Sequence, residues 1–406
     1  MADSALVRRR PSLLTPAFLA VALASLAYFI ADGITIPVLQ VFVVGPLGGD
    51  AVAVGIAYGA FSLSAFLLRP WVGRISDTRG RRPLILGGAA LFGLGVLGHL
   101  VATSLPILVL MRLVLGAGEA MIFVGALAAV SDLAPDARRG EAISYFSLSL
   151  YLGIAIGPFI GEVVLGDDRF ALVWLVAAGM AGLSVIFGLR VPETLARAEP
   201  TPAGTPAPRS GWRGLVHPGG LLPGLVLLAS TTGMGGYFAF TKLYTESLGM
   251  DSSRYAFALL AGVVIVFRTL MPWMPDRLGA RRAASIALAF NTAGLLVIGL
   301  WAAPVGLYVG TGIFAFGVCF AFPALSAMTA QAVPPAERGA AFGTFSAFLD
   351  LAFGLGPAVV GVVVHLNGLG AAYVSGAVVA AAGLALLWFT RPEQPAPAAE
   401  AVSAGR

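Results

Sequence analysis

Charged residues are scarce in this sequence, and cysteine, histidine and lysine are scarcer still. Of its 406 residues, 11% are charged and 58% are hydrophobic. A water-soluble domain cannot bury so large a share of apolar residues beneath so few charged ones. The single cysteine, Cys319, provides neither a disulfide framework nor a thiolate metal site, and the three histidines are scattered along the chain. We therefore expect neither a metal ion nor a cofactor.

Long apolar runs make up most of the chain. Each lasts about 20 residues, the length that a helix needs to cross a bilayer, and none alternates in the shorter pattern of a β-barrel strand. The first run is too long for the core of a signal peptide and is followed by further runs, so we interpret it as an uncleaved helix. Twelve spans are predicted, at residues 13–37, 52–72, 84–102, 107–130, 142–164, 170–189, 221–240, 255–274, 283–302, 306–330, 340–364 and 371–389.

The basic residues indicate how these spans are oriented. Most of the 25 lysines and arginines fall in the two tails and in the connections after every second span, whereas the opposite connections contain only Arg169, Lys242 and Arg254. By the positive-inside rule, both termini are expected in the cytoplasm. The net charge of +5 therefore arises from residues that determine the orientation of the spans. We expect the lipid bilayer and not nucleic acid as the partner.

The chain divides into two halves that repeat one another. The longest connection, residues 191–220, is rich in Pro, Ala, Gly and Thr, as in an unpacked linker. We predict tails at 1–12 and 391–406 and helical bundles at 13–190 and 221–390. One offset of 199 residues aligns the halves without a gap and pairs Arg69 with Arg268, Asp77 with Asp276, Gly80 with Gly279, and Gly157 with Gly356. Parallel repeats of this kind are typical of carriers with a site between two halves.

The loop after the second span reads Gly73-Arg-Ile-Ser-Asp77-Thr-Arg-Gly80-Arg81-Arg82. It resembles the signature loop of the major facilitator superfamily, although Thr78 replaces a usual basic residue. In that family the aspartate meets the start of the eleventh helix and closes the cytoplasmic side, and a carboxylate is favourable at a helix N-terminus. The resemblance implies a cytoplasmic gate formed by Gly73, Asp77, Gly80, Arg81 and Arg82, with Asp276 in the second copy. The alternative is that the arginines only determine topology.

The fourth span contains Arg112-Leu-Val-Leu-Gly116-Ala-Gly118-Glu119, which resembles an intramembrane element of the same superfamily. Seven residues are close to two helical turns, so Arg112 and Glu119 are expected on one face, where the arginine would keep the glutamate ionised. A charge within a span faces a partner or water. Alternatively, Arg112 lies near the extracellular end and extends to the interface.

The fifth span contains Gly153, Gly157, Pro158 and Gly161, which resemble the Gly-Pro-x-x-Gly-Gly element of exporters in the superfamily. Glu162 stands where the second glycine is usual. Small residues at this spacing allow helices to approach closely, and proline bends a helix. Plain helix packing is therefore the alternative to a role in transport direction.

The first span contains Asp32-Gly33-Ile-Thr-Ile-Pro37, similar to the first helix of the drug:proton antiporter branch, with Gln40 where a second proline is often found. An apolar environment disfavours the charged form of Asp32, as suits a group that gains and loses a proton. Its alternative is a structural carboxylate bonded to helix ends. The predicted proton-coupling residues are Asp32, its closest competitor Glu119, Arg112 and Asp350.

Together these features predict an all-α membrane protein of twelve helices in two pseudo-symmetric six-helix bundles, a monomer in the bacterial inner membrane. Carboxylates within the spans and the lack of a phosphate-binding loop for ATP lead us to expect proton coupling. The resemblances of the fifth and first spans imply an exporter, of a small amphipathic or drug-like compound. The alternatives are a proton symporter or facilitator for a sugar or organic acid and, more remotely, a membrane-embedded enzyme or sensor, for which catalytic spacings and signalling domains are lacking. The residues expected to line the substrate cavity, unless they serve only in helix packing, are Tyr28, Tyr151, Tyr237, Asn291 and Phe322.

Overall fold

The computed structural model describes residues 15–134, 139–195, 217–271, 274–333 and 338–390. The expected tails at 1–12 and 391–406 and most of the expected linker lie outside these residues. Helices account for nearly all of the described chain: α1 (Pro16–Val44), α2 (Ala51–Arg79), α3 (Arg82–Gly98) with the 3-10 turn η1 (His99–Val101), α4 (Leu105–Leu133), α5 (Arg139–Leu165), α6 (Phe170–Gly188), α7 (Pro218–Ser247), α8 (Arg254–Leu270), α9 (Met274–Leu278), α10 (Ala280–Leu300), α11 (Pro304–Gln331), α12 (Arg338–Asn367) and α13 (Ala371–Phe389).

Each predicted span corresponds to a helix, and the predicted fold class is confirmed. Eleven helices of the described chain are long and apolar enough to cross a membrane. The eighth span is divided, because α8 has 17 residues and is followed by the five-residue α9. The predicted ends of the first and second spans, at residues 37 and 72, are wrong, since α1 continues to Val44 and α2 continues to Arg79. A proline removes one backbone hydrogen bond, and transmembrane helices tolerate this when neighbouring helices pack around the site.

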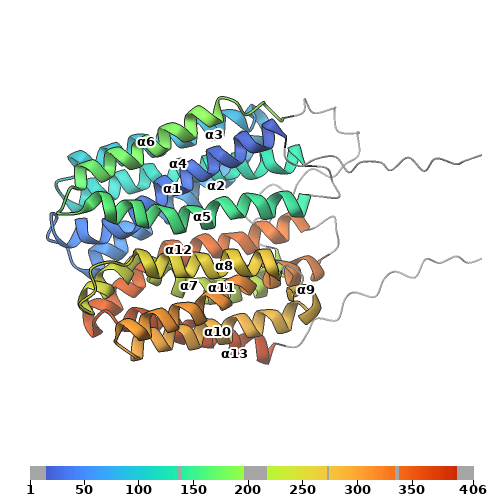
Figure 1. The fold of residues 1–406 in the computed structure, drawn as a ribbon. Helices are drawn as coiled ribbons and strands as arrows, with labels where there is room; N and C mark the ends of the chain where they lie inside the picture. Colours follow the sequence, from blue (N-terminus) through green and yellow to red (C-terminus); the bar gives the residue numbers. More distant parts are fainter. Residues whose placement is uncertain (1–14, 135–138, 196–216, 272–273, 334–337, 391–406) are drawn as a thin grey trace, which may run out of the picture.

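The helices lie side by side in two groups (Figure 1), with α1–α6 in one half and α7–α13 in the other. The halves meet mainly where α2 packs on α12, α5 on α8, and α1 on α7. We name the two ends of the bundle after residues. The Gln40 end contains the connections at 44–51, 165–170, 247–254 and 367–371, and the Arg81 end contains the connections at 79–82, 188–218 and 278–280.

Glycines of the predicted exporter element hold α5 against α1. A Cβ atom added to Gly33 would come 2.5 Å from the carbonyl oxygen of Gly153, and one added to Gly157 would come 2.6 Å from the Cα atom of Gly33. A Cβ atom on Gly161 would likewise crowd the backbone of Ile34. This close approach places Asp32 at the crossing of α1 and α5, next to the bend expected at Pro158.

Candidate functional site

Buried charges inside the spans gather around Arg69 of α2. Its Nη2 atom lies 3.2 Å from Oε1 of Glu119 on α4 and 3.1 Å from Oδ1 of Asp350 on α12. The guanidinium also lies over the ring of Phe123, 4.9 Å from its centroid. Because α4 belongs to the first half and α12 to the second, Arg69 joins the halves through one carboxylate from each.

The predicted partnership of Arg112 with Glu119 differs from the observed contacts. Arg112 is 3% exposed, and its Nε atom donates a hydrogen bond of 3.0 Å to the carbonyl oxygen of Ala57. Its guanidinium lies over the rings of Phe61 and Tyr58. The arginine therefore packs sideways onto α2, which leaves Glu119 to pair with Arg69. Spacing along α4 correctly places two residues on one face, but it does not determine where a long side chain finds its acceptor.

Asp32 is half-buried on α1, and within the described chain its carboxylate has no hydrogen-bond or ion-pair partner. One helical turn earlier, the hydroxyl of Tyr28 is buried without a partner, and on α4 the same holds for Oε2 of Glu119 and Nη1 of Arg112. Buried polar atoms are nearly always satisfied in stable structures. Unsatisfied atoms on α1 and α4, which contact each other, therefore mark this region as a candidate for binding protons or a polar ligand.

Arg268 of α8 is the second-half equivalent of Arg69, and it also reaches across to the other half. Its Nη2 atom donates to the hydroxyl of Tyr151 at 3.1 Å, and its Nη1 atom to the hydroxyl of Ser147 at 3.3 Å, both on α5. The offset of 199 residues that relates the arginines also relates Asp350 to Tyr151. The cross-half contacts of both arginines were not predicted, because they depend on how α2 packs on α12 and α5 on α8.

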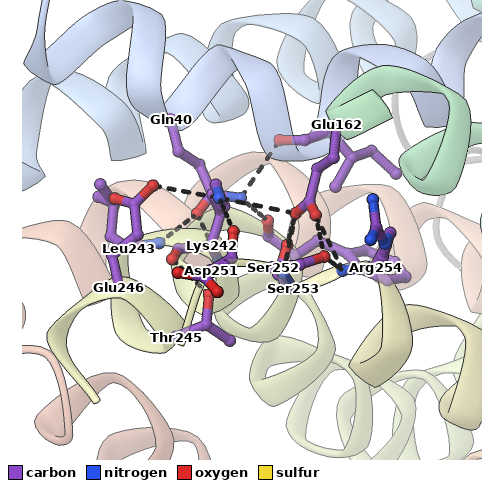
Figure 2. Close-up of polar contacts among 12 residues, drawn as sticks. Gln40, Glu162, Lys242, Leu243, Thr245, Glu246, Asp251, Ser252, Ser253 and Arg254 are labelled. Atoms are coloured by element: carbon purple, nitrogen blue, oxygen red, sulfur yellow. Dashed lines mark hydrogen bonds and ion pairs between the residues drawn. The ribbon is translucent and has the colours of Figure 1, made fainter. Parts of the chain in front are cut away.

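Glu162 forms a second polar cluster, at the Gln40 end (Figure 2). Its carboxylate accepts hydrogen bonds from the backbone N–H of Ser253 at 2.9 Å and of Arg254 at 3.3 Å, and from the hydroxyls of Ser252 and Ser253. These donors begin α8, whose own N-cap residue Ser253 makes no capping bond within its helix. A residue of the first half therefore caps a helix of the second, where a negative charge is favoured by the helix dipole.

Gln40 and Lys242 extend this cluster between α1 and α7. The side-chain nitrogen of Gln40 donates to the carbonyl oxygen of Phe238 at 2.8 Å, and its oxygen accepts from the backbone N–H of Lys242 at 3.0 Å. The ammonium of Lys242 lies 3.2 Å from Glu246 and 3.9 Å from Glu162. The halves are thus joined at the Gln40 end by Lys242 together with Gln40 and Glu162, two residues that were noted in the sequence only as departures from family motifs.

The comparisons with known proteins agree with this architecture. A family model described as Major Facilitator Superfamily matches residues 21–304 and 255–405. The chain belongs to the major facilitator superfamily. An uncharacterized MFS-type transporter of Burkholderia mallei is 30% identical over 372 residues, 88% of each chain, and the MFS-type transporter YhhS of Escherichia coli is 27% identical over 385 residues, 93% of each.

Solved structures of superfamily members share the fold. The nucleoside transporter NupG has a TM-score of 0.73 at 15% identity and covers 92% of this chain and 99% of its own. The human organic anion transporter MFSD10 has a TM-score of 0.68 at 21% identity, and the match covers 93% of this chain and 100% of the MFSD10 chain. The chain is therefore a multi-pass membrane transporter for a small molecule and not an enzyme.

At the Arg81 end, the superfamily loop is anchored by a residue that the sequence analysis assigned to the linker. The carboxylate of Glu193 accepts from the backbone N–H of Arg81 at 2.8 Å and of Arg82 at 3.2 Å. Although slight burial opposes it, these and further backbone N–H donors lower the pKa of Glu193. The side chain of Arg81 pairs with Asp132 at 3.1 Å. The short linker segment that contains Glu193 therefore belongs to the folded first half.

The other predicted gate and cavity residues have varied surroundings. Gly73 is half-buried in α2, and the side chains of Asp77 and Asp276 lie outside the described part of the chain. Tyr237 hydrogen-bonds Thr311, and Asn291 hydrogen-bonds Ser230, both within the second half. Phe322 is 43% exposed and packs on Phe345. Of the five predicted cavity residues, Tyr28 and Tyr151 lie next to the interior charges.

Proposed function

We propose that this transporter is coupled to protons and exports a small amphipathic compound, with the ion pair between Arg69 and Asp350 linking protonation to movement of the halves. One observation carries the proposal: a half-buried arginine is shared by a carboxylate of its own half and a carboxylate of the other. Protonation of Asp350 removes the charge that holds α12 to Arg69. Glu119 stays paired, because it moves together with Arg69 as part of the first half.

Asp32 supplies a second protonation site in this proposal, and we retain it as the leading proton carrier. Its carboxylate has no partner in the described chain, so a proton is not in competition with an ion pair. Burial disfavours the charged form of such a carboxylate. The buried, unpaired hydroxyl of Tyr28 lies one turn away on the same helix and is available to donate to Asp32 or to a ligand.

The proposed direction of transport is export, and the expected orientation and the resemblance to exporters support it. With both termini in the cytoplasm, as the arginine distribution favours, the Gln40 end faces outward. The bonds of Gln40 and Glu162 then hold the outer side closed and leave the inner side to receive the compound. The resemblance of α5 and α1 to exporters supports antiport over symport. The bacterial origin of the relatives supports a place in the inner membrane, where we expect a monomer.

The test is compound-induced proton movement in proteoliposomes that contain a pH-sensitive dye and an imposed pH gradient. A panel of cationic, neutral and anionic amphipathic compounds is applied to wild type, Asp32→Asn, Asp350→Asn and the exposed control Asp167→Asn. We expect proton movement opposite to the compound in wild type and the control. Both membrane variants should bind compound but move no protons. Undiminished proton movement in both would overturn the coupling, and movement in the same direction as the compound would indicate a symporter.

A further inference from the structure

Arg69 and Arg268 occupy equivalent positions in the two halves, but their surroundings differ in charge. Arg69 lies between the carboxylates of Glu119 and Asp350. Under the offset of 199 residues, the position of Glu119 is taken by Val318 and that of Asp350 by Tyr151. Arg268 thus keeps the position of Arg69, but neither of the two equivalent positions around it holds an acidic residue.

Arg268 contacts only uncharged side chains in the described chain. Two of its nitrogens donate to the hydroxyls of Tyr151 and Ser147, its guanidinium lies 4.8 Å from the centroid of the Tyr151 ring, and its Nε atom is buried without an acceptor. The carboxyl end of α8, whose last turn contains Arg268, offers roughly half a negative charge. About half of the positive charge is therefore uncompensated, which is costly inside a membrane.

We propose that Arg268 binds the anionic group of the transported compound, so that the cargo is a small amphipathic anion with a carboxylate, sulfonate or phosphate. The planar guanidinium matches such an oxyanion in geometry as well as in charge. Tyr151 accepts a hydrogen bond from Arg268 and keeps its own hydroxyl hydrogen to donate to the anion. Because Arg268 is half-buried, it remains accessible, and a bound anion would lie between α5 and α8, which belong to opposite halves.

This assignment rests on the proposed function only because it treats the ligand as the transported compound. Ligand binding is therefore measured separately from proton coupling. The purified chain is placed in phosphatidylcholine nanodiscs, whose lipid has no net charge. Equilibrium dialysis then compares 2-naphthoate, naphthalene-2-sulfonate and 2-naphthyl phosphate with the neutral 2-naphthamide and the cationic 2-naphthylmethylammonium. We expect at least one anion to bind wild type about tenfold or more tightly than the amide. Equal binding of anions and amide by wild type overturns the proposal without the need for any variant.

Variants locate the preference at Arg268. Arg268→Gln should reduce the anion preference to within about threefold, whereas Arg282→Gln, a matched change at an exposed arginine of α10, should leave it intact. Val318→Glu places a carboxylate where the first half has Glu119 and should also abolish the preference, because it supplies the missing counter-ion. An anion preference that persists in both Arg268→Gln and Val318→Glu contradicts the assignment.

Two further experiments distinguish a lipid headgroup from a transported anion, and anion binding from proton coupling. If phosphatidylglycerol displaces the naphthalene anions from wild type but not from Arg268→Gln, the site binds a lipid headgroup and the assignment to cargo is overturned. If an anion binds at Arg268 and crosses proteoliposomes without proton movement, the anion site stands and proton coupling fails. If protons exchange only for cationic compounds, the coupling stands and the anionic cargo is excluded.

Discussion

Replacement of Glu162 by alanine should open the Gln40 end of the transporter. The carboxylate joins α5 to the start of α8 through two backbone N–H groups and two hydroxyls, and it is the closest acidic group of the first half to Lys242. A hydrogen bond to a charged group contributes about 1.5–3 kcal/mol, and bonds that share one carboxylate are not additive. We take about 3 kcal/mol for the whole set, which corresponds to a shift of roughly 150-fold toward the open state.

Such a shift is measurable because transporter conformations differ by only a few kcal/mol. Asp167 and Ala302 are exposed at the Gln40 end of opposite halves. Spin labels on Asp167→Cys and Ala302→Cys report the distance between the halves by pulsed electron paramagnetic resonance. Buried Cys319 is replaced by alanine to avoid a third label. We expect a single short distance in the parent and an added longer population in Glu162→Ala.

The matched control is Glu246→Gln, which removes a carboxylate from the same cluster. Glu246 pairs with Lys242 one turn away on α7, so its bond lies within one half and is worth only about 0.3–0.5 kcal/mol. The control should keep the short distance. Identical distance distributions for Glu162→Ala and the parent would refute the argument that the cap on α8 holds this end closed.

Two further predictions concern the glycines near the Arg81 end and the orientation of the chain in the membrane. Gly80 has φ +104°, and an added Cβ atom would overlap the carboxylate of Glu193, so Gly80→Ala should lower the thermal unfolding temperature by several degrees. Gly73→Ala should maintain or raise it, because a Cβ atom there meets nothing within 4 Å; a greater loss in Gly73→Ala would contradict this reasoning. In intact cells, a cysteine at Asp167 should react with an impermeant maleimide and one at Arg190 should not, and the reverse pattern would invert the topology.

The spans, the duplication and the superfamily were predictable because each depends on local sequence. Apolar runs are limited by the thickness of the bilayer, so even the divided eighth span lies within a few residues of its prediction. The repeat was visible because one offset aligns charged and glycine positions together. The end of the first span was predicted too early, at Pro37. The rule that proline ends a helix is weaker where neighbouring helices pack around the proline.

The contacts of the interior charges were not predictable in the same way. Arg69 and Asp350 are far apart in sequence, and their ion pair depends on how α2 and α12 pack, which no spacing along one helix reveals. Arg112 and Glu119 do share a helix, yet a long guanidinium extended to Ala57 instead. Glu162 was noted only as a departure from a glycine motif, because its role requires the start of α8 from the other half.

The duplicated halves differ most where chemistry is expected. The helix contacts are retained in both halves, since α5 packs on α1 and the equivalent α12 packs on α7. Charge is not, because the carboxylates around Arg69 have no acidic equivalents around Arg268. A symmetric pair of arginines with symmetric counter-ions would give two equivalent sites, with no means to treat proton and cargo differently. In the proposed mechanism, this asymmetry provides one arginine whose counter-ion can be titrated and another whose counter-ion is the transported compound. Because the two arginines occupy equivalent positions in the repeat and each contacts the opposite half, events at either one bear on the same interface, as the proposed coupling between proton and cargo requires.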